Sequence, residues 1–230
     1  MNKIKNIIKK VPIYGYIWAV LLIVIQALFY FLGSTISKKL GFKPINMKID
    51  SIDNAIKLIP IFIIPYIYSY ILWFFAPIAV SLTSKKNFIN YLFGILFAYI
   101  IGFTIFIFFP TNISRVDEKL YDNIGNDFLS WLIKIIYDSD GKEYGYNLFP
   151  SYHCLVSTYC YLGIRRQKEI SFSFKVYTLI VAILICMSTI FTKQHYFVDI
   201  LGGVGIAIFT YIIVKIINPG EKITKLQEKE

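Results

Sequence analysis

Long apolar runs constrain the fold of this chain more than any other feature. Six runs approach the roughly 20 apolar helical residues needed to cross about 30 Å of hydrocarbon. They cover residues 14–33, 56–82, 88–110, 151–164, 176–192 and 195–217. Because lipid offers no partners to backbone N–H and C=O groups, such runs form helices. The sequence therefore predicts an all-α fold, an integral membrane bundle of six transmembrane helices.

The composition indicates one domain that lies mostly in lipid. Of the 230 residues 57% are hydrophobic, and no repeat or low-complexity linker divides them. The net charge of +10 does not favour a nucleic-acid partner, because the lysines lie mainly between apolar runs, where they meet lipid headgroups. We expect a single domain over residues 1–230, a first run retained as a span, and three free cysteines.

Basic residues are more numerous on one side of the predicted bundle. That side holds the lysines and arginines of residues 1–10, 85–86, 165–175 and 215–229. The positive-inside rule then places both termini in the cytoplasm. We expect the protein in the plasma membrane. The loop 111–150 and both histidines face the extracytoplasmic side.

The loop 111–150 contains one amphipathic stretch. Large apolar residues recur at helical spacing between residues 128 and 136, whereas Asp127, Ser130 and Lys134 fall on the opposite side. This pattern predicts a short interfacial helix on the membrane surface, as a cover of the bundle or a lid.

The first histidine follows a helix start. Pro150 suits the first turn of a helix, because its missing N–H would have no partner there. The free N–H groups that follow, with the Ser151 hydroxyl, form a site for an anion such as phosphate. His153 lies in the same turn, within reach of a leaving oxygen.

The second histidine has an acid four residues behind it. We expect His195 and Asp199 to meet on one helix face. A carboxylate on one ring nitrogen leaves the other nitrogen free as a nucleophile. The alternative is a structural pair that only joins helices. Zinc is disfavoured, because the chain has no third histidine.

Arg115 is the only one of the three arginines on the predicted outer face. A planar guanidinium is a bidentate partner for phosphate. Its alternative role is that of a cation among lipid headgroups.

Together these motifs resemble the type-2 phosphatidic acid phosphatase superfamily. Its second motif, Pro-Ser-x-His, is present at residues 150–153. Its third, Ser-Arg-x5-His-x3-Asp, is present at residues 188–199, with Thr189 in place of the arginine. The first, Lys-x6-Arg-Pro, survives only as Arg115. The resemblance covers roughly residues 108–203, and the six predicted spans agree with it.

The resemblance implies a role for each conserved type of residue. His195 would attack phosphorus to form a phosphohistidine, Asp199 would orient it, and His153 would protonate the leaving alcohol. The phosphate-binding residues that it implies are Arg115, Ser151 and Tyr152. No metal or other cofactor is implied, so activity should survive a chelator.

The two histidines need opposite protonation states, His195 neutral and His153 charged. We therefore expect a bell-shaped dependence of the phosphate-release rate on pH. A profile measured over roughly pH 5–9 checks this, and a flat profile would contradict the two roles.

Three family positions differ, since Phe108 replaces the lysine, Val116 the proline and Thr189 the arginine. Lys119 or Lys193 is a possible substitute for the missing charge. Fewer cations favour a diester monoanion, and the third motif is similar to the inositol-phosphorylceramide synthase branch. Three hypotheses follow: a phosphatase acting on a lipid phosphate or polyprenyl diphosphate, a lipid head-group phosphotransferase, or a catalytically inert relative. The sequence leaves the oligomeric state open.

Overall fold

The computed structural model of the protein describes residues 10–113, 115, 119–140 and 146–228. Within them the regular structure is helical, apart from one isolated bridge between Ile45 and Thr111. The elements are α2 (Ile13–Lys39), α3 (Asp50–Asp53), the 3-10 helix η1 (Pro60–Phe62), α4 (Ile63–Ser81), α5 (Lys85–Phe108), the 3-10 helix η2 (Leu120–Asn123), α6 (Phe128–Asp140), α7 (Tyr152–Ile164), α8 (Phe172–Phe191), α9 (Phe197–Ile217) and α10 (Pro219–Gln227).

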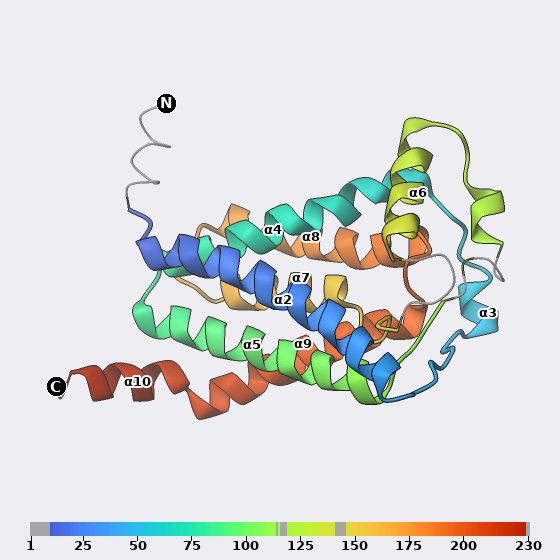
Figure 1. Ribbon diagram of the computed structural model, residues 1–230. Helices are drawn as coiled ribbons and strands as arrows, with labels where there is room; N and C mark the ends of the chain where they lie inside the picture. Colours follow the sequence, from blue (N-terminus) through green and yellow to red (C-terminus); the bar gives the residue numbers. More distant parts are fainter. Residues whose placement is uncertain (1–9, 114, 116–118, 141–145, 229–230) are drawn as a thin grey trace.

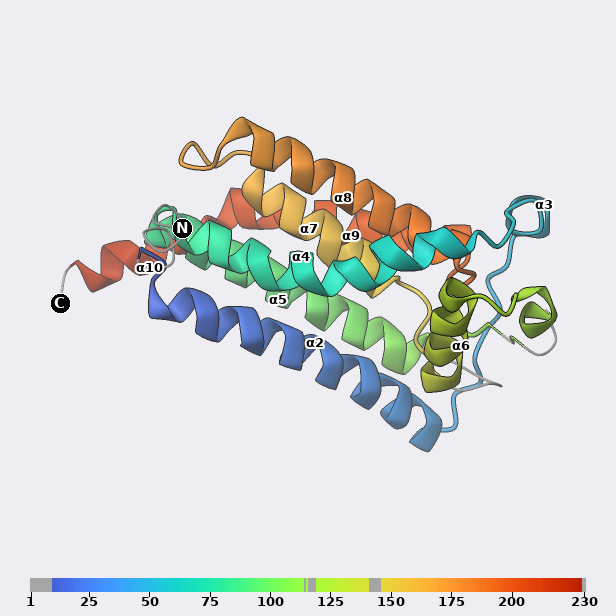
Figure 2. The ribbon, with the colours of Figure 1, turned by 90° about the horizontal axis from the view of Figure 1, so that it is seen from above.

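The long helices run side by side along one axis (Figures 1 and 2). Short α7 lies among them and packs against α4, α5, α8 and α9, so nearly all its side chains are buried. Helix α6 crosses one end of the bundle, near α3, whereas α10 lies at the other end. The start of α2 and all of α10 therefore share the end remote from α6.

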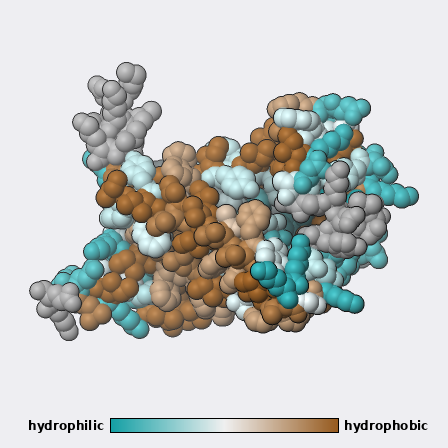
Figure 3. Space-filling view, viewed as in Figure 1, coloured by the Kyte–Doolittle hydropathy of each residue, from teal (hydrophilic) through white to brown (hydrophobic). Residues whose placement is uncertain are grey.

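Five of the six predicted spans form helices long and apolar enough to cross a membrane, by length and composition. These helices are α2, α4 with η1, α5, α8 and α9 with α10. The remaining run, 151–164, forms α7, whose 13 residues extend about 20 Å, less than the hydrocarbon thickness. The face in Figure 3 is hydrophobic over the long helices, with hydrophilic residues gathered toward both ends. The described chain is thus an integral membrane protein of apolar helices, and the count of six spans stays a prediction.

The predicted amphipathic helix is present as α6. The prediction of its polar side is wrong, because Ser130 lies on the buried face. Ser130 is buried together with Ile133 and Tyr137, because this face packs on η1 and α4. Asp127 starts the helix by accepting the backbone N–H groups of residues 129 and 130 and the Ser130 hydroxyl. Those hydrogen bonds, chiefly from Ser130, lower the pKa of the Asp127 carboxyl. Its place at a membrane surface stays a prediction.

Helices α7 and α9 approach each other closely at Gly203. A Cβ atom there would lie 2.5 Å from the Ser151 carbonyl oxygen and 3.0 Å from the backbone nitrogen of Leu155. We expect Gly203→Ala to destabilise the protein by about 1–3 kcal/mol, because backbone atoms have to move apart. Thermal unfolding in detergent measures this.

Gly205→Ala is the matched control on the same helix, since its Cβ atom would meet nothing within 4 Å. It should leave the melting temperature unchanged or raise it slightly, because alanine favours a helix by about 1 kcal/mol over glycine. Equal losses for the two variants would contradict the close approach.

Candidate functional site

A cavity of about 390 Å³ opens at the end of the bundle that α6 crosses. Side chains of α2, α4 and α6 form its walls, and the start of α7 and the loop before α9 contribute polar groups. The polar side chains that line it include Gln26, Arg115, Tyr152, His153, Gln194 and His195. We call this space the histidine cavity. It unites four predicted site residues from three segments that lie far apart in the sequence.

His195 contacts Asp199 as predicted, with 3.2 Å between Nδ1 and the carboxylate Oδ2. The predicted geometry is wrong, however, because α9 begins at Phe197 and His195 precedes it. Asp199 lies in the first turn of α9, where Oδ2 also accepts the Tyr196 N–H at 2.9 Å. A helix-capping carboxylate therefore holds the imidazole, and its other oxygen, Oδ1, is buried without a partner among the described residues.

Three hydrogen bonds that the sequence did not indicate fix the turn before α9. The Asp53 carboxylate accepts the Phe197 N–H at 2.9 Å, and its backbone carbonyl accepts the Lys193 ammonium at 2.8 Å. The Tyr137 hydroxyl donates to the Thr192 carbonyl at 2.7 Å. Burial raises the pKa of Tyr137 well above its ordinary value, against the opposing effect of the nearby Arg115, so this hydroxyl keeps its proton.

His153 lies in an aromatic cage from α4. Its ring stacks on Tyr66 with 4.0 Å between centroids, and the rings of Tyr70 and Trp73 lie at 5.9 Å and 5.0 Å. Its Nε2 is buried and has no hydrogen-bond partner among the described residues. An imidazole nitrogen kept in place without a partner is available to a bound ligand.

The two other predicted residues of α7 have structural contacts. The Ser151 side chain is buried and caps α7 by accepting the Cys154 N–H at 3.5 Å. The Tyr152 ring lines the histidine cavity, but its hydroxyl donates to the Tyr99 carbonyl at 2.9 Å. Both side chains therefore position the start of α7, and a ligand there would meet its backbone N–H groups.

Arg115 is almost fully buried, with 1% of its surface exposed. One guanidinium nitrogen, Nη2, donates to Gln194 Oε1 at 2.8 Å, and the guanidinium carbon lies 4.8 Å from the centre of the Tyr137 ring. The Gln194 side-chain nitrogen is buried without a partner among the described residues and lines the same cavity. Gln194 was missed by the sequence reasoning, because an amide next to a histidine has no distinctive pattern.

Two positions that differ from the family motifs, Phe108 and Thr189, do not line the histidine cavity. Phe108 is 62% exposed at the end of α5, and the Thr189 hydroxyl is buried against α7, 3.7 Å from the Cys154 sulfur. The proposed substitutes do not line the cavity either, since Lys119 is exposed and Lys193 binds Asp53. Val116 lies outside the described residues. Within the described chain, Arg115 is the one arginine or lysine that lines the cavity.

The described cysteines are free thiols, as predicted. Cys154 and Cys160 are buried, and Cys186 is partly exposed. In the described ranges, no three histidine, cysteine, aspartate or glutamate side chains gather closely enough to hold a metal ion.

Comparison with known proteins assigns the chain to a family. A family model described as the PAP2 superfamily matches residues 35–213. No curated protein and no solved structure matches the chain. The long apolar helices together with this family match identify the chain as a membrane protein of the phosphatase or phosphotransferase type. The protein belongs to the PAP2 superfamily, and the predicted membership is confirmed.

Proposed function

We propose that this protein hydrolyses a lipid phosphate or a polyprenyl diphosphate through a phosphohistidine intermediate. The observation that carries the proposal is one cavity lined by His195, His153 and Arg115, with Asp199 bonded to His195. Those groups supply a nucleophile, an acid and a cation, which are the parts that phosphoryl transfer needs.

The reaction takes two steps. The Nε2 atom of His195 attacks phosphorus, the bond to the ester oxygen breaks with both electrons leaving on that oxygen, and His153 supplies its proton. His153 then takes a proton from water, whose oxygen attacks phosphorus and breaks the bond to His195. Arg115 and the N–H groups at the start of α7 stabilise the charge on the phosphate oxygens in both steps.

The walls of the histidine cavity support a lipid substrate. Apolar side chains of α2, α4 and α6 enclose it, among them Ile23, Ile67 and Leu132. The cavity thus offers polar groups at the phosphate and apolar surface beyond it, as a ligand with a hydrocarbon tail requires. It lies at the end remote from α10. We propose that this end is extracytoplasmic and that both termini are cytoplasmic in the plasma membrane.

A single arginine favours one second candidate, transfer of a phospho-head-group between lipids. The dianion of a phosphate monoester needs more neutralisation than the monoanion of a diester. With no arginine or lysine other than Arg115 among the described residues lining the histidine cavity, a diester substrate is the natural alternative. This reaction would use the same His195 intermediate, with an alcohol in place of water.

Phosphate release from defined lipids in micelles separates these candidates. The panel contains phosphatidic acid, phosphatidylglycerol phosphate, undecaprenyl diphosphate and the diester phosphatidylglycerol, each with and without an alcohol acceptor. Release without acceptor, lost in His195→Gln, supports the hydrolase. Head-group transfer only with an acceptor supports the transferase. Silence across the panel, with folded protein, supports the inert relative and overturns the proposal.

Gln26 is placed to distinguish between lipid classes. It lies on α2, is 9% exposed, lines the histidine cavity and has no hydrogen-bond partner in the described part of the chain. We expect its amide to donate to an ester carbonyl of a diacyl substrate, a group that polyprenyl chains lack. Gln26→Leu should lower kcat/KM for phosphatidic acid about threefold to tenfold, the value of one neutral hydrogen bond.

The dialkyl ether analogue of phosphatidic acid is the matched control, because it lacks both carbonyls. Its kcat/KM, and that for undecaprenyl diphosphate, should be unchanged by Gln26→Leu. An equal loss for ester and ether lipids would contradict carbonyl recognition.

A further inference from the structure

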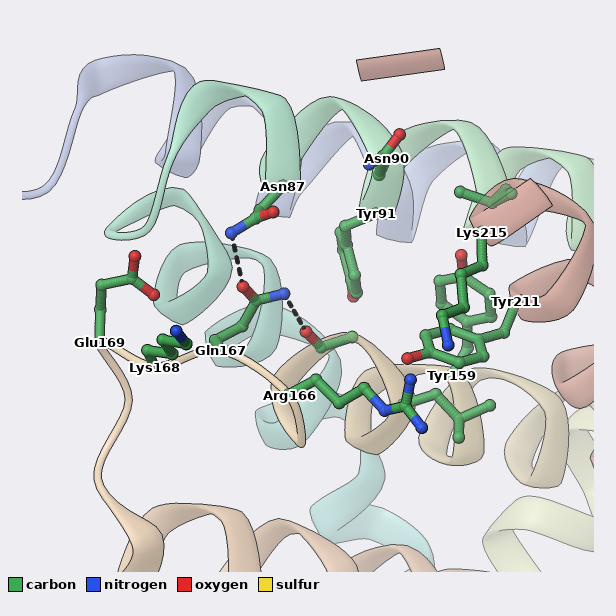
Figure 4. A pocket seen from close by; sticks show the side chains of 13 residues that line it. Asn87, Asn90, Tyr91, Tyr159, Arg166, Gln167, Lys168, Glu169, Tyr211 and Lys215 are labelled. Carbon is green, nitrogen blue, oxygen red and sulfur yellow. Dashed lines mark hydrogen bonds between the residues drawn. The ribbon is translucent and has the colours of Figure 1, made fainter. Parts of the chain in front are cut away.

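A second pocket, of about 340 Å³, lies toward the α10 end of the bundle, remote from the histidines. Figure 4 shows it from close by. The first turns of α5, the last turn of α7 with the loop after it, and the end of α9 enclose it. We call this space the basic pocket, because Arg166, Lys168 and Lys215 line it. Neither the family motifs nor the proposed reaction uses any of its residues.

Charge is unbalanced in the basic pocket. Arg166, Lys168 and Lys215 make no hydrogen bond or ion pair with any described residue, and Glu169 is the one carboxylate among the described lining residues. In Figure 4 the ends of Arg166 and Lys215 point toward each other, whereas Glu169 lies on the far side of Gln167. Two cations that converge without a carboxylate between them repel each other, and a bound anion would remove that repulsion.

Neutral side chains hold the walls of the pocket in place. The Asn87 amide donates to Gln167 Oε1 at 2.7 Å, and Gln167 Nε2 donates to the Gly163 carbonyl at 2.8 Å (Figure 4). Asn90 joins α5 to the start of α10 by accepting the Gly220 N–H at 2.8 Å. The Tyr159 ring lines the pocket and is 1% exposed overall, with its hydroxyl against Gly94 of α5. A wall held by hydrogen bonds and packing is typical of a built binding site.

We propose that the basic pocket binds the phosphate group of an anionic phospholipid headgroup. The guanidinium of Arg166 supplies paired donors for phosphate oxygens, and the Lys215 ammonium adds a second charge from another helix. The lining residues of the pocket belong to the ends of α5, α7 and α9 that lie toward α10 (Figure 1), the end at which we expect lipid headgroups to meet the protein. Because it joins the end of α7 to the end of α9, the bound lipid stabilises the two helices whose other ends carry His153 and Asp199.

The test is thermal unfolding of the full chain in a neutral detergent. Phosphatidylglycerol, phosphatidylcholine with the same acyl chains, and inorganic phosphate are added separately. We expect phosphatidylglycerol to raise Tm by several degrees and phosphatidylcholine to have no such effect. The double variant Arg166→Gln/Lys215→Gln should lose at least half of that rise. A rise of the same size in this variant would overturn the proposal.

Lys175→Gln/Lys222→Gln is the matched control, with the same charge change at residues that do not line the pocket. It should retain the full rise. Arg115→Gln tests the histidine cavity separately. If phosphatidylglycerol fails to raise Tm in Arg115→Gln but still raises it in Arg166→Gln/Lys215→Gln, the lipid binds in the histidine cavity and not in the basic pocket. A third outcome is that inorganic phosphate alone raises Tm in wild-type protein and not in Arg166→Gln/Lys215→Gln. That result would assign the pocket to a soluble phosphate and overturn the proposal of a lipid ligand.

Native mass spectrometry of Lys215→Gln alone keeps the proposal testable if the double variant does not fold. Wild-type protein should retain at least one phosphatidylglycerol more than this variant. Equal occupancy in both proteins would contradict the pocket.

Discussion

Replacing His195 with glutamine is expected to lower kcat for phosphate release by about 10⁴-fold or more, because no other group can form the covalent intermediate. Glutamine is similar in size to histidine, and the Tyr196 N–H still donates to the Asp199 carboxylate, so the turn before α9 should stay in place. Phosphate release at saturating lipid measures the loss. Unchanged thermal unfolding shows that the loss is chemical.

Asp199→Asn tests how the nucleophile is oriented. The carboxylate accepts both the Tyr196 N–H and the His195 ring nitrogen, and an asparagine oxygen can keep the first of these bonds. We expect kcat to fall by about 10²–10⁴-fold, since the favoured tautomer of His195 is lost.

The outcome that contradicts the role of His195 is activity in His195→Gln. If this variant retains more than a tenth of the wild-type activity, His195 is not the nucleophile.

Trapping provides a second readout of the same step. Wild-type protein is quenched in alkaline denaturant during turnover of a lipid that carries the label in its phosphate group. The protein should retain this label in a bond that is labile in acid and stable in base. His195→Gln should retain none. Label in that variant would assign the covalent bond to another residue.

The second large effect is expected at Arg115. Its guanidinium lies in the histidine cavity, held by Gln194 at 2.8 Å and by the face of the Tyr137 ring. Arg115→Gln should lower kcat by about 10²–10³-fold, the range for removing one fixed donor to a developing charge. Arg115→Lys should recover only part of the activity, because an ammonium cannot donate two parallel hydrogen bonds.

Added guanidinium ion checks that the effect is local. Millimolar guanidinium should raise the activity of Arg115→Ala severalfold and leave wild-type protein unchanged. Gln194→Leu should act through Arg115. It should therefore lower kcat strongly in wild-type protein and only slightly in a protein that already carries Arg115→Gln. Additive effects of these two substitutions would show that Gln194 contacts the substrate itself.

Much of the fold could be predicted from the sequence, because an apolar run in lipid has to be helical. Helices α5 and α9 follow the predicted runs with small shifts at their ends, whereas α2 continues past the predicted residue 33 to Lys39. The pattern on α6 predicted a helix but not its buried face. Ser130 faces the protein because Ile133 and Tyr137, one turn and two turns further on, pack beneath the helix. Periodicity alone does not show which neighbours a helix will meet.

Part of the site was also readable from the sequence. His195 and Asp199 are four residues apart, so a single turn brings them together whether or not the helix includes both. Ser151 marks the start of α7 as its N-cap, whereas Pro150, predicted in the first turn, precedes the cap and lies outside the helix. Each of these predictions depends on neighbours in the chain.

What only the tertiary structure decided are the contacts between distant segments. Packing of α4 on α7 places Tyr66 against His153, and the loop after α5 brings Arg115 to Gln194. Packing also buries Thr189 against Cys154 of α7, so this side chain does not line the histidine cavity. The sequence by itself determined the helices and the local pairs, because backbone hydrogen bonds and short spacing fix them. Which distant side chains share a cavity depends on how the helices pack.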